Sequence, residues 1–595
     1  MIISYGEKKI GVLKKINFEK YLLPYLIIAF FVIVVGCYYG IWTGNPLGDD
    51  AFVHVGRTQF IVNHFPNINW YPFWFLGFNM FETSPSMYYF LTGLANVTTG
   101  ISVPQLMVIS VFLSNFLLGV GVYKFSKLLG LPWYVSTGFS LVFLSLPSVW
   151  DFVLGGTYMR IPARTFLVLS IVAAYRYLLK INKKNESWSA YLLAVFLPAF
   201  AISLHPMWGG GIFVVVVTAL MYFLAVRGGK QKVKTLLKVF MPVGGLVSVF
   251  FLPTLGFLIS GASGGSVISP DLTLGSFESI FTSSNPILLP CTLFLVALSI
   301  FMHKRYENFL AGERKSLLII FLVLTLYFFL FGWLPMPENA YFMAAYDYRR
   351  WFGFFLLLFL IPLSSLLYTS FSSNYSNGLS RPLKNNDPTS IKKIRTNKNL
   401  IMKFLSVTII LMIFAAFAVS LPTVKITNLN PDDPKSMVYS LSAALDQIDS
   451  EVPNNFRLTA ASRRVYAIHP YKYPQLELTC GRQIGSPHAY YDSLFMERVF
   501  CRYHEDQMWY RDERARFYSE VPYSSSNFFS SMFWMDWYGV DGIIITRWEQ
   551  SKEYYPTFYE YKLKPHYFNA TEISGGVTYI RYHESSPIVV STNAS

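Results

Sequence analysis

The sequence predicts a polytopic α-helical membrane protein followed by a smaller soluble region of mixed α/β structure. The 595-residue chain is 53% hydrophobic and 18% aromatic, and its mean hydropathy is +0.38, which is a composition typical of membrane proteins. Apolar runs near the length of about 20 residues that crosses a bilayer recur from residue 21 to residue 421 and stop there. Lysine and arginine collect in alternate loops between these runs, as the positive-inside rule predicts.

The first expected span is Tyr21–Trp42. Lysines precede it and no small-residue cleavage site follows it, which indicates a retained anchor with a cytoplasmic N-terminus. The loop 43–103 then lies outside the membrane. Within this loop, Met87–Asn96 is apolar but short, so we expect a helix that lies in the outer interface without crossing.

The remaining apolar runs predict ten further crossings, which makes about eleven in total and leaves residues 422–595 outside. The basic residues at or just beyond the inner ends of these crossings, such as Lys124, Lys180 and Lys315, then face the cytoplasm. The expected crossings are Pro104–Lys127, Pro132–Trp150, Ile161–Leu179, Trp188–His205, Trp208–Val226, Val239–Ile259, Pro286–Met302, Ser316–Leu334, Trp351–Tyr368 and Phe404–Leu421.

Residues 422–595 contain short apolar or alternating runs separated by polar segments, a pattern that predicts an extracytoplasmic α/β domain. The expected strands are Phe456–Thr459, Gly542–Thr546 and Gly576–Tyr582, and Pro434–Ile448 is compatible with a helix. Cys480 and Cys501 also lie in this region. They are either free thiols or a disulfide, depending on the redox compartment.

Asp49 and Asp50 lie where the chain leaves the first span. If Asp50 begins a helix, then Asp50, His54, Arg57 and Ile61 share one face, because residues three and four apart are stacked. A carboxylate and an imidazole one turn apart can exchange a proton or share a divalent metal. The alternative is that either aspartate simply caps the helix by accepting hydrogen bonds from its first N–H groups.

The first loop resembles that of the GT-C membrane glycosyltransferases. The resemblance is carried by the acidic pair after the first span, the amphipathic segment, the aromatic run WYPFWF (residues 70–75) and the stretch SPSMYYFLTGL (residues 84–94). Among these proteins the loop looks most like the prokaryotic branch labelled as 6-pyruvoyl-tetrahydropterin synthase-related membrane proteins. The resemblance implies that Asp49 or Asp50 acts as base or metal ligand while a sugar leaves a polyprenyl-phosphate carrier.

Other polar residues are expected to converge on the same outer face. His54, Asp151 and His205 are candidate supporting residues, and the resemblance implies that basic residues bind the donor phosphate. These basic candidates are Arg349 and Arg350, then Arg160 and Arg164. The alternative explanation for these arginines is that they extend from helix ends to the membrane surface. The resemblance also makes Asp151, with Asp49 and Asp50, a candidate ligand for Mg²⁺ or Mn²⁺.

The predicted function is therefore sugar transfer from a polyprenyl-phosphate donor to a glycan, lipid or protein acceptor at the outer face of the plasma membrane. The alternative is a lipid or polysaccharide transporter or flippase, but no paired halves with midplane charges are visible. A third possibility is a surface protein that uses its spans only as a membrane anchor, but eleven expected spans exceed what anchoring requires. The net charge of +15 is explained by membrane topology instead of nucleic-acid binding, and no phosphate-binding glycine loop of the nucleotide-dependent enzymes is present.

Overall fold

The computed structural model describes only part of the chain. The described residues are 22–43, 46–48, 51–68, 70–71, 78–79, 87–185, 187–205, 211–226, 228–261, 312–333, 351, 353–366, 368, 443, 446–447, 450, 457–460, 477–478, 542–546, 568–573 and 577–582.

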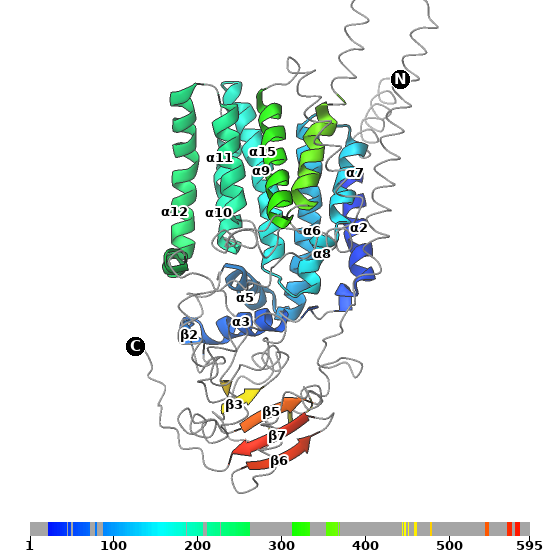
Figure 1. Cartoon of the computed structure of the whole chain (residues 1–595), viewed down its shortest axis with the longest axis vertical. Coiled ribbons are helices and arrows are strands. Elements are labelled where there is room, and N and C mark those ends of the chain that lie inside the picture. Colours follow the sequence, from blue (N-terminus) through cyan, green and yellow to red (C-terminus); the bar gives the residue numbers. More distant parts are fainter. Residues whose placement is uncertain are drawn as a thin grey trace, which may run out of the picture.

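A bundle of helices forms the largest part of the described structure (Figure 1). It contains α2 (Leu23–Tyr38), α6 (Val103–Leu128), α7 (Trp133–Leu144), α8 (Pro147–Leu154), α9 (Arg160–Asn182), α10 (Trp188–Leu204), α11 (Gly211–Ala225), α12 (Gly229–Gly261), α15 (Gly312–Trp333) and the helix Gly353–Leu366. The predicted crossings in these parts of the chain are therefore helical, as expected. Two predicted crossings, Pro286–Met302 and Phe404–Leu421, lie outside the described residues.

One predicted crossing, Pro132–Trp150, is wrong as a single helix. It is divided into α7 and α8 by Ser145 and Leu146. Pro147 explains the break, because it has no N–H to donate and its ring would clash with the carbonyl of the residue four positions earlier. Pro147 instead begins α8, where the missing N–H has no cost. The indole N–H of Trp150 donates to the Leu144 carbonyl at 2.7 Å and so satisfies one carbonyl at the end of α7.

The lengths and surfaces of the helices suit a lipid environment. Among the described residues, α6 and α9, with 26 and 23 residues, are long and apolar enough to span a membrane. Large apolar side chains are also exposed on the outside of the bundle, including Phe30, Phe196 and Val323. Many exposed apolar side chains are unfavourable in water but favourable in lipid. The helix lengths and the exposed apolar side chains therefore fit a membrane protein.

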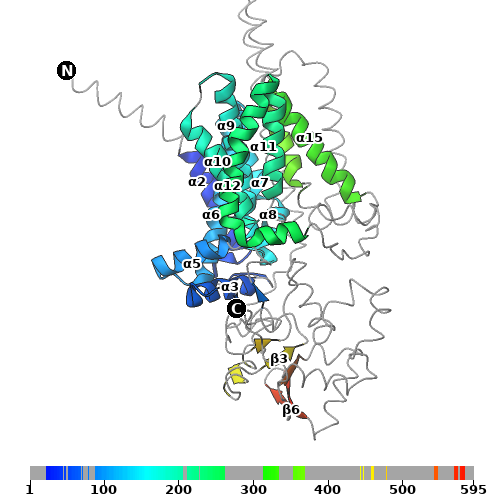
Figure 2. The same cartoon turned by 90° about the vertical axis from the view of Figure 1, so that its left-hand side faces the viewer.

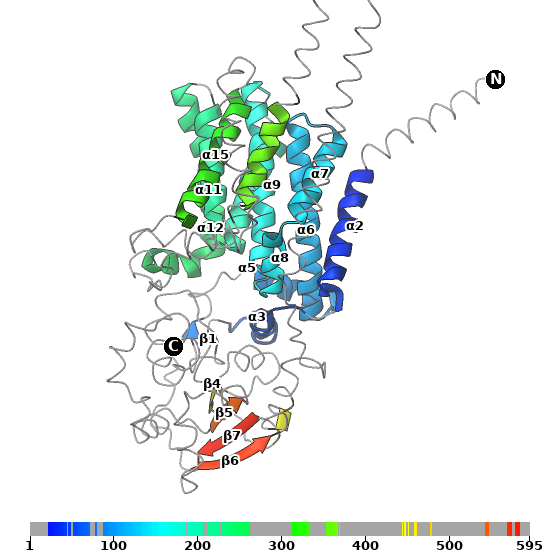
Figure 3. The ribbon, with the colours of Figure 1, turned by 45° about the vertical axis from the view of Figure 1, so that its right-hand side comes forward.

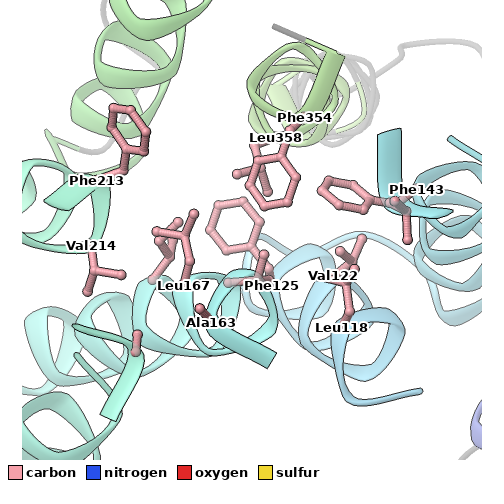
Figure 4. Packing of buried hydrophobic residues seen from close by; sticks show 14 of the residues in the cluster. Leu118, Val122, Phe125, Phe143, Ala163, Leu167, Phe213, Val214, Phe354 and Leu358 are labelled. Atoms are coloured by element: carbon pink, nitrogen blue, oxygen red, sulfur yellow. The ribbon is translucent and has the colours of Figure 1, made fainter. Parts of the chain in front are cut away.

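Small residues on α6 allow its neighbours to approach closely. A Cβ atom on Gly119 would lie 2.7 Å from Ile28 of α2, and one on Gly121 would lie 3.0 Å from Val168 of α9. Such residues favour helix packing in membranes, where dispersion contacts dominate. Around α6, the buried side chains of α7, α9, α11 and the helix Gly353–Leu366 form one apolar core (Figure 4).

Hydrogen bonds between helix ends define one end of the bundle. The amide of Asn182, the last residue of α9, donates to Glu313 at the start of α15 at 2.7 Å and to the carbonyl of Ala225, the last residue of α11, at 3.3 Å. Between α10 and α12, the Tyr191 hydroxyl donates to the Lys238 carbonyl at 3.1 Å. These contacts bring together the helix ends that carry Lys180, Lys183, Lys184, Lys230, Lys232, Lys234, Arg314 and Lys315. We call this the basic end.

At the opposite end, two shorter helices pack on the bundle (Figures 1 and 2). Helix α3 (Ala51–His64) runs across the bundle end, and α5 (Met87–Thr99) lies beside it. In the sequence, strands β1 (Trp70–Tyr71) and β2 (Phe78–Asn79) follow α3 and precede α5, and they pair antiparallel. The expectation that residues 87–96 form a separate short helix is confirmed. We call this the site end.

The described part of the C-terminal region contains a five-stranded mixed sheet of order β4-β3-β5-β7-β6, which lies beyond the site end (Figure 3). Its strands are β3 (Arg457–Ala460), β4 (Glu477–Leu478), β5 (Gly542–Thr546), β6 (Phe568–Ile573) and β7 (Val577–Tyr582). Strands β4 and β5 run parallel to β3, and β7 runs antiparallel to both β5 and β6. The predicted strand Gly542–Thr546 matches β5, and the other two predicted strands overlap β3 and β7 with bounds that differ by one residue. Cys480 and Cys501 lie outside the described residues.

Candidate functional site

The segment immediately before α3 is fixed against the loop between α8 and α9. The backbone N–H of Leu47 donates to the Tyr158 hydroxyl at 2.7 Å, and Tyr158 is fully buried. Gly48 has a φ of +93°, and a Cβ atom there would lie only 2.1 Å from the backbone nitrogen of Gly156. The two loops therefore touch backbone to backbone, one residue before Asp49. Asp49 and Asp50 themselves lie outside the described residues.

Helix α3 directs a polar face into the site end. It begins at Ala51, whose N–H donates to the Gly48 carbonyl at 3.1 Å. His54, Arg57 and Ile61 are all buried, as are most of the described side chains of this helix, including Val55 and Thr58. Burial of an imidazole and a guanidinium so close together requires hydrogen-bond partners or an anion nearby.

Tyr89 of α5 supplies one of these partners. Its fully buried hydroxyl lies 2.7 Å from His54 Nδ1, 3.5 Å from a terminal nitrogen of Arg57 and 3.9 Å from the Met159 sulfur. The His54 and Tyr89 rings lie 5.7 Å apart. One phenol thus connects α3, α5 and the start of α9.

His205 and Arg160 complete the group. His205 follows the last residue of α10 and is buried. His205 is coupled electrostatically to Arg160 and to His54. Because such coupling falls with distance, the three side chains lie near one another. We call His54, Arg57, Tyr89, Arg160 and His205 the His54 cluster.

Arg160 is the first residue of α9, and Arg164 follows one turn later. Cations at a helix N-terminus oppose the helix dipole, whereas an anion bound there is favoured. The guanidinium carbon of Arg160 lies 5.7 Å from the Phe152 ring centroid. The beginning of α9 therefore concentrates positive charge at the site end in a place that suits an anionic ligand.

Arg164 lies among aromatic rings rather than in the His54 cluster. It is 2% exposed, and its guanidinium carbon is 4.1 Å from the Phe152 ring centroid, 5.1 Å from that of Trp351 and 5.4 Å from that of Phe354. Stacking of this kind stabilises a desolvated arginine. Trp351 directly follows the predicted phosphate ligands Arg349 and Arg350, which lie outside the described residues.

The structure thus brings together three predicted site residues, His54, Arg160 and His205. Asp151 lies in α8, but its side chain is outside the described part of the structure. Within the described ranges, no group of three or more His, Cys, Asp or Glu side chains could hold a metal ion. A role for Asp49, Asp50 and Asp151 as metal ligands stays a prediction.

Sequence reasoning missed the residues that fix this arrangement. Tyr89 belongs to the apolar run around residues 87–91, where a tyrosine resembles an ordinary interfacial aromatic. The sequence around Tyr158 contains no motif that would indicate its role. Gly48 offered a signal, because a glycine directly before a helix-starting acidic pair is compatible with a positive φ, but its close approach to Gly156 depends on residues more than 100 positions away.

Comparisons with known proteins find structures with a similar fold but no similar sequence. No protein-family model matches the chain, and no curated protein sequence matches it. Among solved structures, it is similar to the oligosaccharyltransferase AglB of Archaeoglobus fulgidus in complex with an inhibitory peptide and a dolichol-phosphate, with 11% identity, a TM-score of 0.52 and coverage of 97% of this chain and 75% of that one.

Two further structures are also similar. The A. fulgidus oligosaccharyltransferase in complex with Zn and sulfate has 11% identity and a TM-score of 0.50, with 88% of this chain and 68% of that chain covered. ArnT from Cupriavidus metallidurans bound to undecaprenyl phosphate has 13% identity and a TM-score of 0.49, with 95% and 99% covered. At these identities the likeness to the oligosaccharyltransferase concerns the fold alone.

Proposed function

We propose that this protein is a membrane glycosyltransferase of the GT-C type that transfers a sugar from a polyprenyl-phosphate-linked donor to an acceptor. The observation that carries the proposal is the His54 cluster, which gathers two arginines and two histidines at one end of an oligosaccharyltransferase-like helix bundle. The cluster is next in sequence to Asp49 and Asp50. The sequence of the first loop, residues 43–103, resembles that of the pterin synthase-related branch, which supports a place for this protein in that branch of the GT-C superfamily.

In the proposed reaction, Asp49 or Asp50 accepts the proton of the acceptor nucleophile. The nucleophile attacks the anomeric carbon of the donor sugar, and the bond from that carbon to the phosphate oxygen breaks. The lipid phosphate leaves with the bonding electrons. Arg57 and Arg160, together with Arg349 and Arg350, would stabilise this leaving phosphate.

A divalent metal such as Mg²⁺ or Mn²⁺ would be held by the carboxylates of Asp49, Asp50 and Asp151. Bound there, it would supply positive charge to the phosphate. The similar oligosaccharyltransferase structure with Zn and sulfate supports a metal of this kind. The acceptor would be a glycan, lipid or protein, and the C-terminal region 422–595 would form a separate extracytoplasmic domain that shapes the acceptor site.

The test is transfer of radiolabelled sugar from a panel of polyprenyl-phosphate donors by membranes carrying the wild type, Asp49→Asn or Asp50→Asn. Asp446→Asn is a matched control, because Asp446 is exposed in the C-terminal region. We expect loss of at least 100-fold (roughly 10²–10⁴ for a general base) in one of the two variants, at normal protein level, and no loss in the control. Equal transfer by all four proteins would remove the acidic pair from the mechanism. No transfer with any donor would favour the transporter.

A further inference from the structure

Helix α12 lies at one edge of the bundle in Figure 1 and faces the viewer in Figure 2. It contacts α10 and α11. Thr235, Val239 and Val243 are buried, and because residues four apart lie on the same side of a helix, these three residues mark the inward face. The side chains on the opposite side of α12 are exposed.

This exposed side changes in character along the helix. Lys230 and Lys234 are exposed in the first two turns. Leu237 and Met241 follow at spacings of three and four residues, so they lie on the same side, and they are also exposed. We call these four residues the α12 face. Because α12 begins at the basic end, the charged part of the α12 face lies there and the apolar part lies further along the bundle.

The neighbouring helices have a similar arrangement at the basic end. Phe223 of α11 is exposed, and the Lys232 ammonium lies 4.9 Å from its ring centroid. At the start of α10, Trp188 is exposed and its ring centroid lies 5.2 Å from that of Tyr191. Tryptophan and tyrosine at helix ends are typical of the headgroup level of a bilayer. The sequence contains no Asp or Glu between residues 211 and 261, so neither α11 nor α12 carries an acidic side chain to neutralise these lysines.

We propose that the α12 face binds a bilayer phospholipid with an anionic headgroup, whose phosphate lies beside Lys230 and Lys234 and whose acyl chain lies along Leu237 and Met241. Lysines at this level are attracted to anionic lipids, and the exposed apolar side chains suit an acyl chain. A soluble acidic protein or a nucleic acid would use only the charged part. This lipid is not the proposed sugar donor, because the face begins at the end of the bundle opposite the His54 cluster, and the proposal does not rest on the proposed function.

Gly244 and Gly245, further along α12, raise the alternative that a second copy of the chain covers this face. A Cβ atom on either glycine would meet nothing within 4 Å, and small residues allow helices to approach closely in membranes. In a symmetric dimer, however, the same surface of both copies meets. Lys230 and Lys234 would then face their equivalents in the other copy, and like charges repel. The charge of the face therefore favours an anionic lipid.

The positive-inside rule alone does not require lysines on one helix face, because it depends on the number of basic residues in short loops. Lys183 and Lys184 provide a matched comparison. They are exposed at the same end of the bundle, but they lie in the turn after α9 instead of on a helix face with apolar side chains. Replacing this pair removes the same charge as replacing Lys230 and Lys234.

The test is native mass spectrometry of the full-length protein in detergent, titrated with phosphatidylglycerol or with phosphatidylcholine of the same acyl chains. We expect the wild type to bind phosphatidylglycerol more tightly. Lys230→Gln/Lys234→Gln should bind it about 30-fold more weakly, roughly fivefold for each lysine near an anionic lipid, and Lys183→Gln/Lys184→Gln should bind it as the wild type does. Equal affinities for the two lipids, or equal losses in the two double variants, would overturn the proposal.

Leu237→Ser/Met241→Ser tests the apolar part of the face while it retains both lysines. Both side chains are exposed, so we expect a folded protein that binds phosphatidylglycerol more weakly than the wild type. Unchanged binding would show that charge alone attracts the lipid and would contradict a site on this face.

The same spectra report the oligomeric state. We expect monomers with bound phosphatidylglycerol, and a Gly244→Leu variant that binds it much as the wild type does, because a flexible acyl chain can adapt to one added side chain. A dimer that Gly244→Leu dissociates would instead assign the face to a second copy of the chain. None of these measurements depends on sugar transfer, so the proposed function and this proposal can fail separately.

Discussion

At the scale of single residues, Gly48 sets the distance between the acidic pair and the α8–α9 loop. Its φ of +93° already favours glycine, and a Cβ atom would meet the Gly156 nitrogen at 2.1 Å and the Leu154 carbonyl oxygen at 2.5 Å. Backbone atoms cannot rotate away as a side chain can. Any residue other than glycine must therefore move one loop relative to the other and displace Asp49 and Asp50.

We predict that Gly48→Ala lowers the thermal stability and abolishes sugar transfer. Gly40→Ala is the matched control, because Gly40 also has a positive φ, +67°, but a Cβ atom there would meet nothing within 4 Å. Both variants lose about 1 kcal/mol from the left-handed backbone, and only Gly48→Ala adds a clash. Melting temperature and transfer activity in detergent would be compared. Equal values for the two variants would show that the loop contact is unimportant.

Arg164 is the second residue whose role is decided by its surroundings. Lysine keeps the charge but loses the planar group that stacks on Phe152 and Trp351. We predict that Arg164→Lys lowers stability by about 1–2 kcal/mol, the value of a desolvated cation–π contact. Arg176→Lys on the same helix, at an exposed position, should change nothing measurable.

Thermal unfolding of these two variants tests the stacking directly. Transfer activity tests a further consequence, since Trp351 follows Arg349 and Arg350 in the chain. If stacking positions this pair, Arg164→Lys should lose activity even at temperatures where it stays folded. A stable but fully active Arg164→Lys would leave Arg164 with no positioning role.

The sequence could indicate which residues are polar in an apolar context, but not which of them meet. His54, Arg160 and His205 were recoverable because ionisable groups at the ends of spans are costly and therefore informative. Arg164 was expected to bind phosphate, yet its described neighbours are aromatic rings. The difference depends on where α8 and the helix Gly353–Leu366 pack against α9. Spacing within one segment cannot provide that information.

At the scale of elements, hydrogen bonds between helix ends hold the basic end together. Asn182 bridges α9 to α15 and to α11 by donating to Glu313 and to the Ala225 carbonyl. A hydrogen bond to a charged acceptor contributes about 1.5–3 kcal/mol. Since lipid-facing surfaces add little preference between helix neighbours, such contacts help to fix the order of the bundle.

We predict that Asn182→Ala destabilises the bundle by about 1.5–3 kcal/mol and that Asn185→Ala, at an exposed position three residues later, does not. A double-mutant cycle with Glu313→Ala should give a coupling energy of about 0.5–3 kcal/mol. Chemical unfolding in mixed micelles would measure both. Additive effects of Asn182→Ala and Glu313→Ala would contradict the contact.

The elements themselves were largely predictable, because apolar length and proline position determine them locally. Pro147 also shows the limit of hydropathy: the run Pro132–Trp150 contains no charged residue, yet it forms two helices. The physical reason is local, since proline lacks a backbone donor, and a closer reading of Pro147 would have found the break. By contrast, the pairing of β3 with β5 joins residues more than 80 positions apart and has no local signal.

At the scale of the whole molecule, the two ends of the helix bundle differ in whether their basic side chains are exposed or buried. The basic end carries exposed lysines such as Lys183 and Lys184, whereas Arg57 and Arg164 at the site end are buried. Exposed lysines near span ends retain a loop in the cytoplasm. This rule does not account for the buried arginines at the other end. This division supports an orientation in which the His54 cluster faces outward.

The orientation can be tested with single cysteines in a background that lacks Cys37, Cys291, Cys480 and Cys501. Asn67→Cys, exposed after α3, reports the site end, and Lys183→Cys, exposed after α9, reports the basic end. We predict that a membrane-impermeant maleimide labels Asn67→Cys on intact cells and labels Lys183→Cys only after permeabilisation. The reverse pattern would place the cluster in the cytoplasm, where its donor would have to be a cytoplasmic one. Labelling of both on intact cells would contradict a bundle that spans the membrane, and with it the apolar exterior as a lipid-facing surface.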